Sequence, residues 1–167
     1  MNAILYQCVW FVGVLGREPL APIAFALLAL HLALCRERGA ELALLAAAAA
    51  LGVAIDSMLT LAGVFVFDPT ATVLPIPAWL VAIWLAFAAT LRNALRFLLS
   101  RLPLAIVAGA VGGPLSYLAA ARLGAVSLPL GTWPTAAVLA LVWAFTMPAL
   151  IMLARAIERR AREEAPA

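Results

Sequence analysis

The sequence predicts an all-α fold, a polytopic membrane bundle of six transmembrane helices with both termini in the cytoplasm. Of the 167 residues, 67% are hydrophobic and 11% are charged, and the mean hydropathy is +1.12. A soluble domain is closer to half apolar and a quarter charged. Several apolar runs also reach the roughly 20 helical residues needed to cross a bilayer of about 30 Å. The chain is therefore expected to form one membrane domain, with no separate soluble domain.

Turn residues and prolines divide the apolar sequence into helices. The first helix is expected over residues 3–16 and the second over residues 20–35, with Arg-Glu-Pro as the turn between them. The N-terminal run lacks a basic flank and an Ala-x-Ala cleavage site, so it is expected to be a membrane helix and not a signal peptide. The third helix, residues 41–67, ends at a Pro-rich loop that cannot continue it. Pro77 is well placed to open the fourth helix, which is expected to run to Leu99.

The last third of the sequence supplies two more helices and a charged end. The fifth helix is expected from Pro103 to Leu123, and Pro134 opens the sixth. Residues 1–154 then form a single six-helix transmembrane domain. Residues 155–167 are expected to be a basic cytoplasmic tail.

The distribution of arginine predicts the orientation of the bundle. All eleven basic residues are arginines, and they gather in alternate turns and in the tail, whereas the opposite loops contain only Arg17 and Arg122. By the positive-inside rule both termini are cytoplasmic. The sequence pI of about 9.5 reflects these helix ends and does not predict nucleic-acid binding. Because Lys is absent and Ala, Leu, Gly and Pro are abundant, we expect a multi-pass protein of a bacterial inner membrane from a GC-rich genome.

An aspartate, Asp56, lies inside the apolar segment LGVAIDSMLT, residues 51–60. An Asp at the centre of a membrane helix costs about 2.5–3.5 kcal/mol on insertion scales, so this side chain is expected to face the bundle interior. Counting about 1.5 Å per residue from the outer interface places Arg92 roughly 6 Å deeper than Asp56, within reach of its side chain. The expected Asp56–Arg92 pair is either a structural pin that fixes helix register or a site that handles a ligand or protons.

Other polar residues are expected to join Asp56 and Arg92 in a polar core, which is the candidate ligand-binding site. These residues are Asn93, Tyr117, Ser116 and Gln7. Their amide and hydroxyl groups could satisfy a buried carboxylate. No residue of the chain is assigned a catalytic role.

The segment AGAVGGPLSYLAAAR in the fifth helix is rich in small residues. Gly109, Gly112 and Gly113 would let another backbone approach closely. Pro114 is expected to interrupt the helix near the midplane, where many transporters build binding sites from discontinuous helices. The alternatives are plain packing for the glycines and a plain kink for the proline.

Known catalytic and metal-binding motifs are absent from the sequence. Asp56 and Ser57 are not a nucleophile–base pair, because adjacent helical residues do not face each other. The two cysteines, Cys8 and Cys35, and the one histidine, His31, lie on scattered apolar segments and make a poor metal site. The sequence therefore predicts neither a metal nor a cofactor.

Three segments carry a resemblance to a known family: LGVAIDSMLT, PAWLVAIWLAFAATLRNALRFL and GAVGGPLSYLAAARLGAV. Over nearly its whole length the chain resembles a small bacterial inner-membrane family catalogued as domain of unknown function 2878, most specifically in the Gly-Gly-Pro-Leu-x-Tyr element at residues 112–117. Genes of that family often neighbour those of cyclopropane-fatty-acid-synthase-like methyltransferases and other envelope lipid-modifying functions, so the resemblance implies a lipid context. The spacing of Gly52 and Asp56 is also similar to a Gly-x-x-x-Asp element of the rod-shape-determining membrane protein, which itself resembles the substrate-capture subunits of vitamin transporters.

Three classes of function remain open from the sequence. The favoured class is a non-enzymatic accessory protein that binds or presents lipid, or that scaffolds an envelope lipid-modifying enzyme. The second is transport or substrate capture of a small solute, and the third is a membrane enzyme acting on a lipid or isoprenoid. The expected partners are membrane lipid and a lipid-modifying enzyme or other membrane protein. The oligomeric state is left open.

Overall fold

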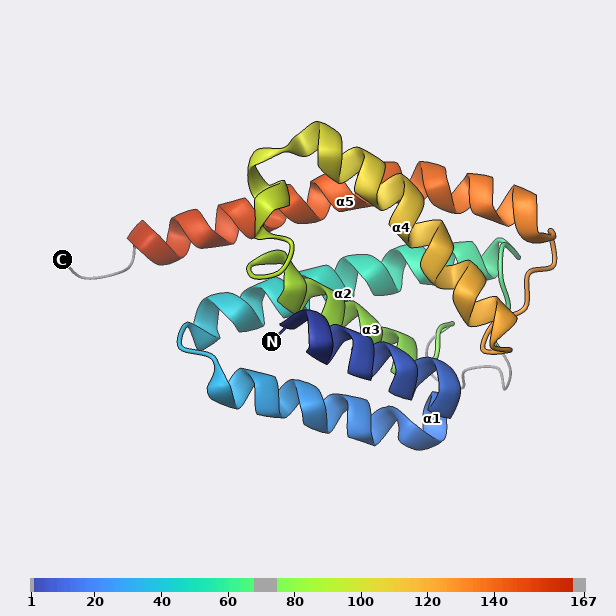
Figure 1. The fold of residues 1–167 in the computed structure, drawn as a ribbon, viewed down its shortest axis with the longest axis horizontal. Helices are drawn as coiled ribbons and strands as arrows, with labels where there is room; N and C mark the ends of the chain where they lie inside the picture. Colours follow the sequence, from blue (N-terminus) through green and yellow to red (C-terminus); the bar gives the residue numbers. More distant parts are fainter. Residues whose placement is uncertain (1, 68–74, 164–167) are drawn as a thin grey trace.

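The computed structural model describes residues 2–67 and 75–163, which form an all-α bundle (Figure 1). The elements are α1 (Asn2–Leu34), α2 (Arg38–Leu61), α3 (Ala78–Leu91), the short 3₁₀-helix η1 (Arg96–Ser100), α4 (Leu102–Arg122) and α5 (Thr132–Glu163). By length and composition, four of these helices, α1, α2, α4 and α5, could cross a membrane. The structure therefore supports a helical membrane protein. The expected Pro-rich loop at residues 68–74 lies outside the described residues.

The long helix α1 consists of two helical halves joined at Arg17. Arg17 has φ 51° and ψ −144°, a conformation that non-glycine residues rarely adopt. The chain reverses there, and the two halves run in opposite directions (Figure 1). The helices expected over residues 3–16 and 20–35 are thus the two halves of one element.

The turn at Arg17 is tied to two other helices. The Arg17 guanidinium donates a hydrogen bond to the carbonyl of Gly124, just after α4. The Glu18 carboxylate accepts a hydrogen bond of 2.6 Å from the backbone N–H of Ala78, the first residue of α3. A carboxylate at this position also interacts favourably with the positive end of the helix dipole. Arg17 therefore holds the turn to the end of α4, and Glu18 holds it to the start of α3.

Three predicted helix boundaries differ from those in the structure. The helix expected over residues 41–67 runs as α2 from Arg38 to Leu61, and the chain leaves the helix before Gly63, whose φ is 72°. The helix expected to reach Leu99 ends as α3 at Leu91, where the Asn93 side chain donates to the carbonyl of Ala89 and the chain turns into η1. The segment expected to be a tail instead continues α5 as far as Glu163. An ion pair of 3.7 Å between Glu158 and Arg92 ties this end of α5 to the bundle.

The helices pack mainly in pairs, and α1 and α4 meet along a seam with few contacts. α4 lies mainly against α5, α1 lies mainly against α3, and α2 contacts both α3 and α5. α1 and α4, in contrast, hardly contact each other. At the end of the bundle near the Arg17 turn, an isolated bridge between Val66 and Ser127 joins the segments that follow α2 and α4. The bundle therefore has an α1–α3 layer and an α4–α5 layer, with a seam of few contacts between α1 and α4.

The capping role of Glu18 leads to a stability prediction. Glu18→Ala removes an acceptor from the first turn of α3, and loss of such a cap typically costs about 0.5–2 kcal/mol. For a chain of this size, each kcal/mol lost from the free energy of unfolding lowers Tm by about 2–4 °C. Thermal unfolding of the detergent-purified protein, followed by circular dichroism, measures it. Glu163→Ala, at the exposed end of α5, is the matched control, and equal Tm values for the two variants would contradict the capping role.

Candidate functional site

The buried carboxylate of Asp56 lies where α2, α3 and α4 meet. Asp56 is fully buried in α2. Its Oδ2 accepts a hydrogen bond of 2.7 Å from the Trp84 indole N–H in α3. The Tyr117 hydroxyl in α4 lies 2.7 Å from both Asp56 oxygens and donates to the carboxylate. Two donors thus satisfy the one aspartate in the apolar segment of α2, and they join three helices.

Small residues make room for these donors. A Cβ atom at Gly52, one turn before Asp56, would overlap the Trp84 indole. The absence of a side chain there lets the indole lie flat on α2 and reach the carboxylate. On the other side, the Tyr117 ring stacks on Phe65, with centroids 5.1 Å apart and planes 21° apart. The Gly-x-x-x-Asp element is therefore the surface on which Trp84 packs.

The aromatic packing continues from Trp84 into α5. The rings of Trp84 and Trp143 stack with centroids 5.1 Å apart and planes 9° apart. Trp143 in turn lies against Gly113, where an added Cβ would overlap its indole, and its backbone carbonyl lies against Gly109. The glycines of α4 thus serve close helix packing. Pro114 does not interrupt α4, which remains helical from Leu102 to Arg122.

A cavity of about 380 Å³ lies between the α1–α3 and α4–α5 layers. Its walls are almost entirely apolar and aromatic, and its volume is in the range of about 300–1,000 Å³ of small-molecule sites. Trp84, Tyr117 and Gly112 are among the wall residues, whereas Asp56 lies behind them. Across the seam, the Trp10 indole N–H in α1 donates a hydrogen bond of 2.9 Å to Ser116 Oγ in α4.

The predicted pair between Asp56 and Arg92 is wrong. Arg92 follows the end of α3, and its guanidinium faces three carboxylates in place of Asp56. It pairs with Glu37, with Glu41 at 3.3 Å and with Glu158 of α5 at 3.7 Å. The depth estimate assumed an uninterrupted helix beyond Leu91. The expected place of Tyr117 in the same core as Asp56 agrees with its hydrogen bond to the carboxylate, whereas Trp84 was not expected there.

The remaining residues of the predicted polar core are divided among different places. Tyr117 and Ser116 line the apolar cavity. Arg92 and Asn93 line a second cavity, of about 380 Å³, which is surrounded by charged residues at the opposite end of the bundle from the Arg17 turn. Gln7 is exposed and belongs to neither cavity. The structure therefore brings together only part of the predicted site.

The environment of Arg92 stabilises the protonated form of its guanidinium. Burial by itself lowers the pKa of the guanidinium, but the hydrogen bond with Glu37 and the charges of Glu37, Glu41 and Glu158 outweigh it. The pKa of Arg92 therefore lies above its ordinary value. Arg92 is a permanent cation that joins the start of α2, the end of α3 and the last turns of α5.

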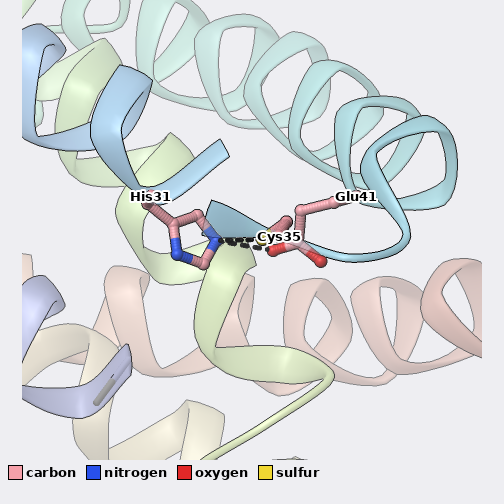
Figure 2. A group of neighbouring side chains, drawn as sticks. All are labelled: His31, Cys35 and Glu41. Atoms are coloured by element: carbon pink, nitrogen blue, oxygen red, sulfur yellow. Dashed lines mark hydrogen bonds and ion pairs between the residues drawn. The ribbon is translucent and has the colours of Figure 1, made fainter. Parts of the chain in front are cut away.

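Beside Arg92, three side chains converge that the sequence did not associate with one another (Figure 2). His31 Nε2 lies 3.0 Å from Glu41 Oε1 and 3.4 Å from Cys35 Sγ. Glu41 was overlooked because only cysteines and histidines were considered as a group. The available signal was the four-residue spacing of His31 and Cys35 at a helix end, followed by a glutamate in the first turn of the next helix.

Comparison with known proteins assigns the chain to a family. Residues 1–149 match the family described as protein of unknown function (DUF2878). The chain belongs to the DUF2878 family. No curated protein and no solved structure matches it. The family resemblance of the three sequence segments is thereby confirmed, whereas the similarity to the rod-shape protein and to vitamin-transporter subunits gains no support.

The hydrogen bonds of Asp56 in this DUF2878 protein can be tested by a double-mutant cycle. Tyr117→Phe removes one of two donors to the carboxylate and should cost about 1–3 kcal/mol in the free energy of unfolding. Combined with Asp56→Asn, it should cost less than the sum of the single effects, with a coupling of about 0.5–3 kcal/mol. Equilibrium unfolding in detergent measures the free energy of unfolding of wild type, of the two single variants and of the double variant. The control is Trp133→Phe, at an 83% exposed position, whose effect on the free energy of unfolding should add to that of Asp56→Asn. If the effects of Tyr117→Phe and Asp56→Asn also added, the contact between Tyr117 and Asp56 would be contradicted.

Proposed function

We propose that this protein is an accessory protein of the bacterial inner membrane that holds one lipid molecule in the apolar cavity. It would present this lipid to an envelope lipid-modifying enzyme or scaffold that enzyme, without catalysing a reaction itself. The observation that carries the proposal is the cavity, a space of about 380 Å³ lined by aromatic and aliphatic side chains in a helical membrane protein.

The extent of the cavity favours a long apolar ligand. Its walls run from Phe67 and Val126, near the Arg17 turn, to Leu95 and Leu98 at the other end of α3. The space therefore follows the long axis of the bundle, as an extended acyl or isoprenoid chain would require. The polar groups of the walls are few, so they could orient a headgroup without making the cavity hydrophilic.

The position of the cavity favours entry from the membrane. It lies along the seam where α1 and α4 hardly contact each other. Gly112, on the α4 side of this seam, is an exposed wall residue. A lipid could therefore enter sideways between α1 and α4 without leaving the bilayer.

The chemistry of the walls favours binding over catalysis. Among the described wall residues the ionisable side chains are those of Tyr6 and Tyr117. General acid–base catalysis usually depends on a titratable group within hydrogen-bond reach of the substrate. Asp56 is separated from the cavity by Trp84 and Tyr117, which occupy its oxygens. Its role in this proposal is to position these two aromatic walls.

The proposed topology has six crossings with both termini in the cytoplasm. The helical segments, counting the two halves of α1 separately, alternate in direction along the chain (Figure 1). The connections rich in arginine, which include Arg36, Arg38 and Arg96, gather at one end of the bundle together with the C-terminal end of α5. The positive-inside rule places that end in the cytoplasm.

Filling the cavity tests the proposal. A Cβ at Gly112 meets no atom within 4 Å, so Gly112→Phe should place its ring in the cavity without disturbing helix packing. We expect native mass spectrometry with lipid extraction to find one hydrophobic species at one copy per wild-type chain, and to find it lost from Gly112→Phe.

The adjacent position provides the matched control. Val111 is 54% exposed and is not a wall residue, so Val111→Phe should keep the bound species. Equal Tm values for the two variants would show that both are folded. The lipid-binding proposal would be rejected if wild-type protein carried only bulk phospholipid in membrane proportions, or if the folded Gly112→Phe variant retained the species.

A further inference from the structure

We infer that His31, Cys35 and Glu41 form a binding site for one divalent transition-metal ion of the Zn²⁺ class. This site is separate from the lipid-binding proposal, because it lies at the charged end of the bundle and not in the apolar cavity. The argument rests on the convergence of three different ligand atoms, on their burial and on the surroundings of the glutamate.

The three ligand atoms are close to the spacing that a bound ion requires. His31 Nε2 lies 3.0 Å from Glu41 Oε1 and 3.4 Å from Cys35 Sγ, and all three atoms lie within 4.8 Å of one another. In a tetrahedral zinc site the metal–ligand bonds are about 2.0–2.3 Å long, so the ligand atoms lie about 3.4–3.6 Å apart. The two separations from His31 therefore need adjustments of a few tenths of an ångström. Cys35 and Glu41, which lie within 4.8 Å of each other, would approach by up to about 1.2 Å to hold the ion (Figure 2).

The local structure explains why these side chains meet. His31 and Cys35 are four residues apart at the C-terminal end of α1, so they lie on one face. A short turn then starts α2, and Glu41 lies in its first turn. His31 is 7% exposed and Glu41 is 3% exposed. Exposed acidic clusters often form without any ligand, but here the histidine and the carboxylate are both buried and converge on one point.

The surroundings leave one coordination position free. Cys35 and Glu41 line the charged cavity, whereas His31 is not among its wall residues. An ion held by the three side chains would face this cavity with its fourth position, the arrangement found in zinc sites that bind water or a substrate. Arg92 donates to Glu41 Oε2 at 3.3 Å and leaves Oε1 for the ion. Such outer hydrogen bonds orient ligating carboxylates.

The donor set determines the kind of metal. One sulfur, one imidazole nitrogen and one carboxylate oxygen suit Zn²⁺ and its transition-metal neighbours, whereas Mg²⁺ and Ca²⁺ prefer oxygen ligands only. Binding replaces the thiol proton by the ion and releases that proton to solvent, since a coordinating thiol is deprotonated.

Titration of the full-length, detergent-purified protein with Co²⁺ tests the inference. The protein is first stripped with a chelator and kept reduced. We expect one equivalent of Co²⁺ to bind, with a thiolate-to-cobalt charge-transfer band in the near ultraviolet that Zn²⁺ abolishes by displacement. Cys35→Ser should lose this band. Cys8→Ser, which changes the exposed cysteine in the first half of α1, should keep it.

A second variant distinguishes a metal site from a purely structural ion pair. His31→Gln removes a ligand, so it should weaken Co²⁺ binding by at least the roughly 10–100-fold that loss of an outer-shell partner costs, while circular dichroism and gel filtration verify its fold. Absence of one-equivalent binding to wild type or to Cys8→Ser would overturn the inference even if the other variants failed to fold. Persistence of the band in Cys35→Ser, or displacement of Co²⁺ by millimolar Mg²⁺, would overturn it as well.

Discussion

A carboxylate enclosed by apolar helices must be given hydrogen-bond donors, and the arrangement of this bundle depends on how Asp56 obtains them. Trp84 and Tyr117 supply one donor each from two other helices. To reach the carboxylate, the Trp84 indole needs the flat surface at Gly52, and its outer face is then covered by Trp143 of α5. One polar contact therefore fixes the relative placement of α2, α3, α4 and α5. The uncompensated alternative, a buried carboxylate without donors, would cost several kcal/mol.

The same contact separates the molecule into two chemically different regions. Because neutral donors satisfy Asp56, no arginine is needed in the interior, and the cavity beside Tyr117 stays apolar. A cluster of charged side chains lies at the end of the bundle opposite the Arg17 turn, where Arg92 is shared by three glutamates and Glu41 also contacts His31. Two cavities of similar volume thus have opposite chemistry. An apolar ligand and a charged ligand could be bound by one small chain without competing for the same residues.

Composition and turn residues predicted the all-α membrane class, the reversal at Arg17 and the interior position of Asp56. Tyr117 was expected in the same core as Asp56, but the donor Trp84 was missed. Sequence reasoning matched opposite charges, and an indole N–H within an apolar run looks like plain hydrocarbon. The end of α3 was missed because apolar residues resume at Ala94 and continue, apart from Arg96, to Leu99 after the polar pair Arg92 and Asn93, so the sequence looks like one amphipathic helix. The meeting of His31 with Glu41 depends on the conformation of a short turn, which no periodic pattern encodes.

The broken α1 and the short α3 also determine how the protein fits its membrane. α3 has 14 residues, and at about 1.5 Å per residue it spans about 21 Å, well below the hydrocarbon thickness of about 30 Å. α5 has 32 residues, and the part before its charged last turns, residues 132–154, is long enough for that thickness. In the proposed six-crossing topology the two flanks of the bundle present different hydrophobic lengths, and local thinning of the bilayer beside the α1–α3 flank is one way to relieve the mismatch. This thinning would disorder acyl chains at the seam itself, so that membrane thickness would influence which lipids approach the cavity.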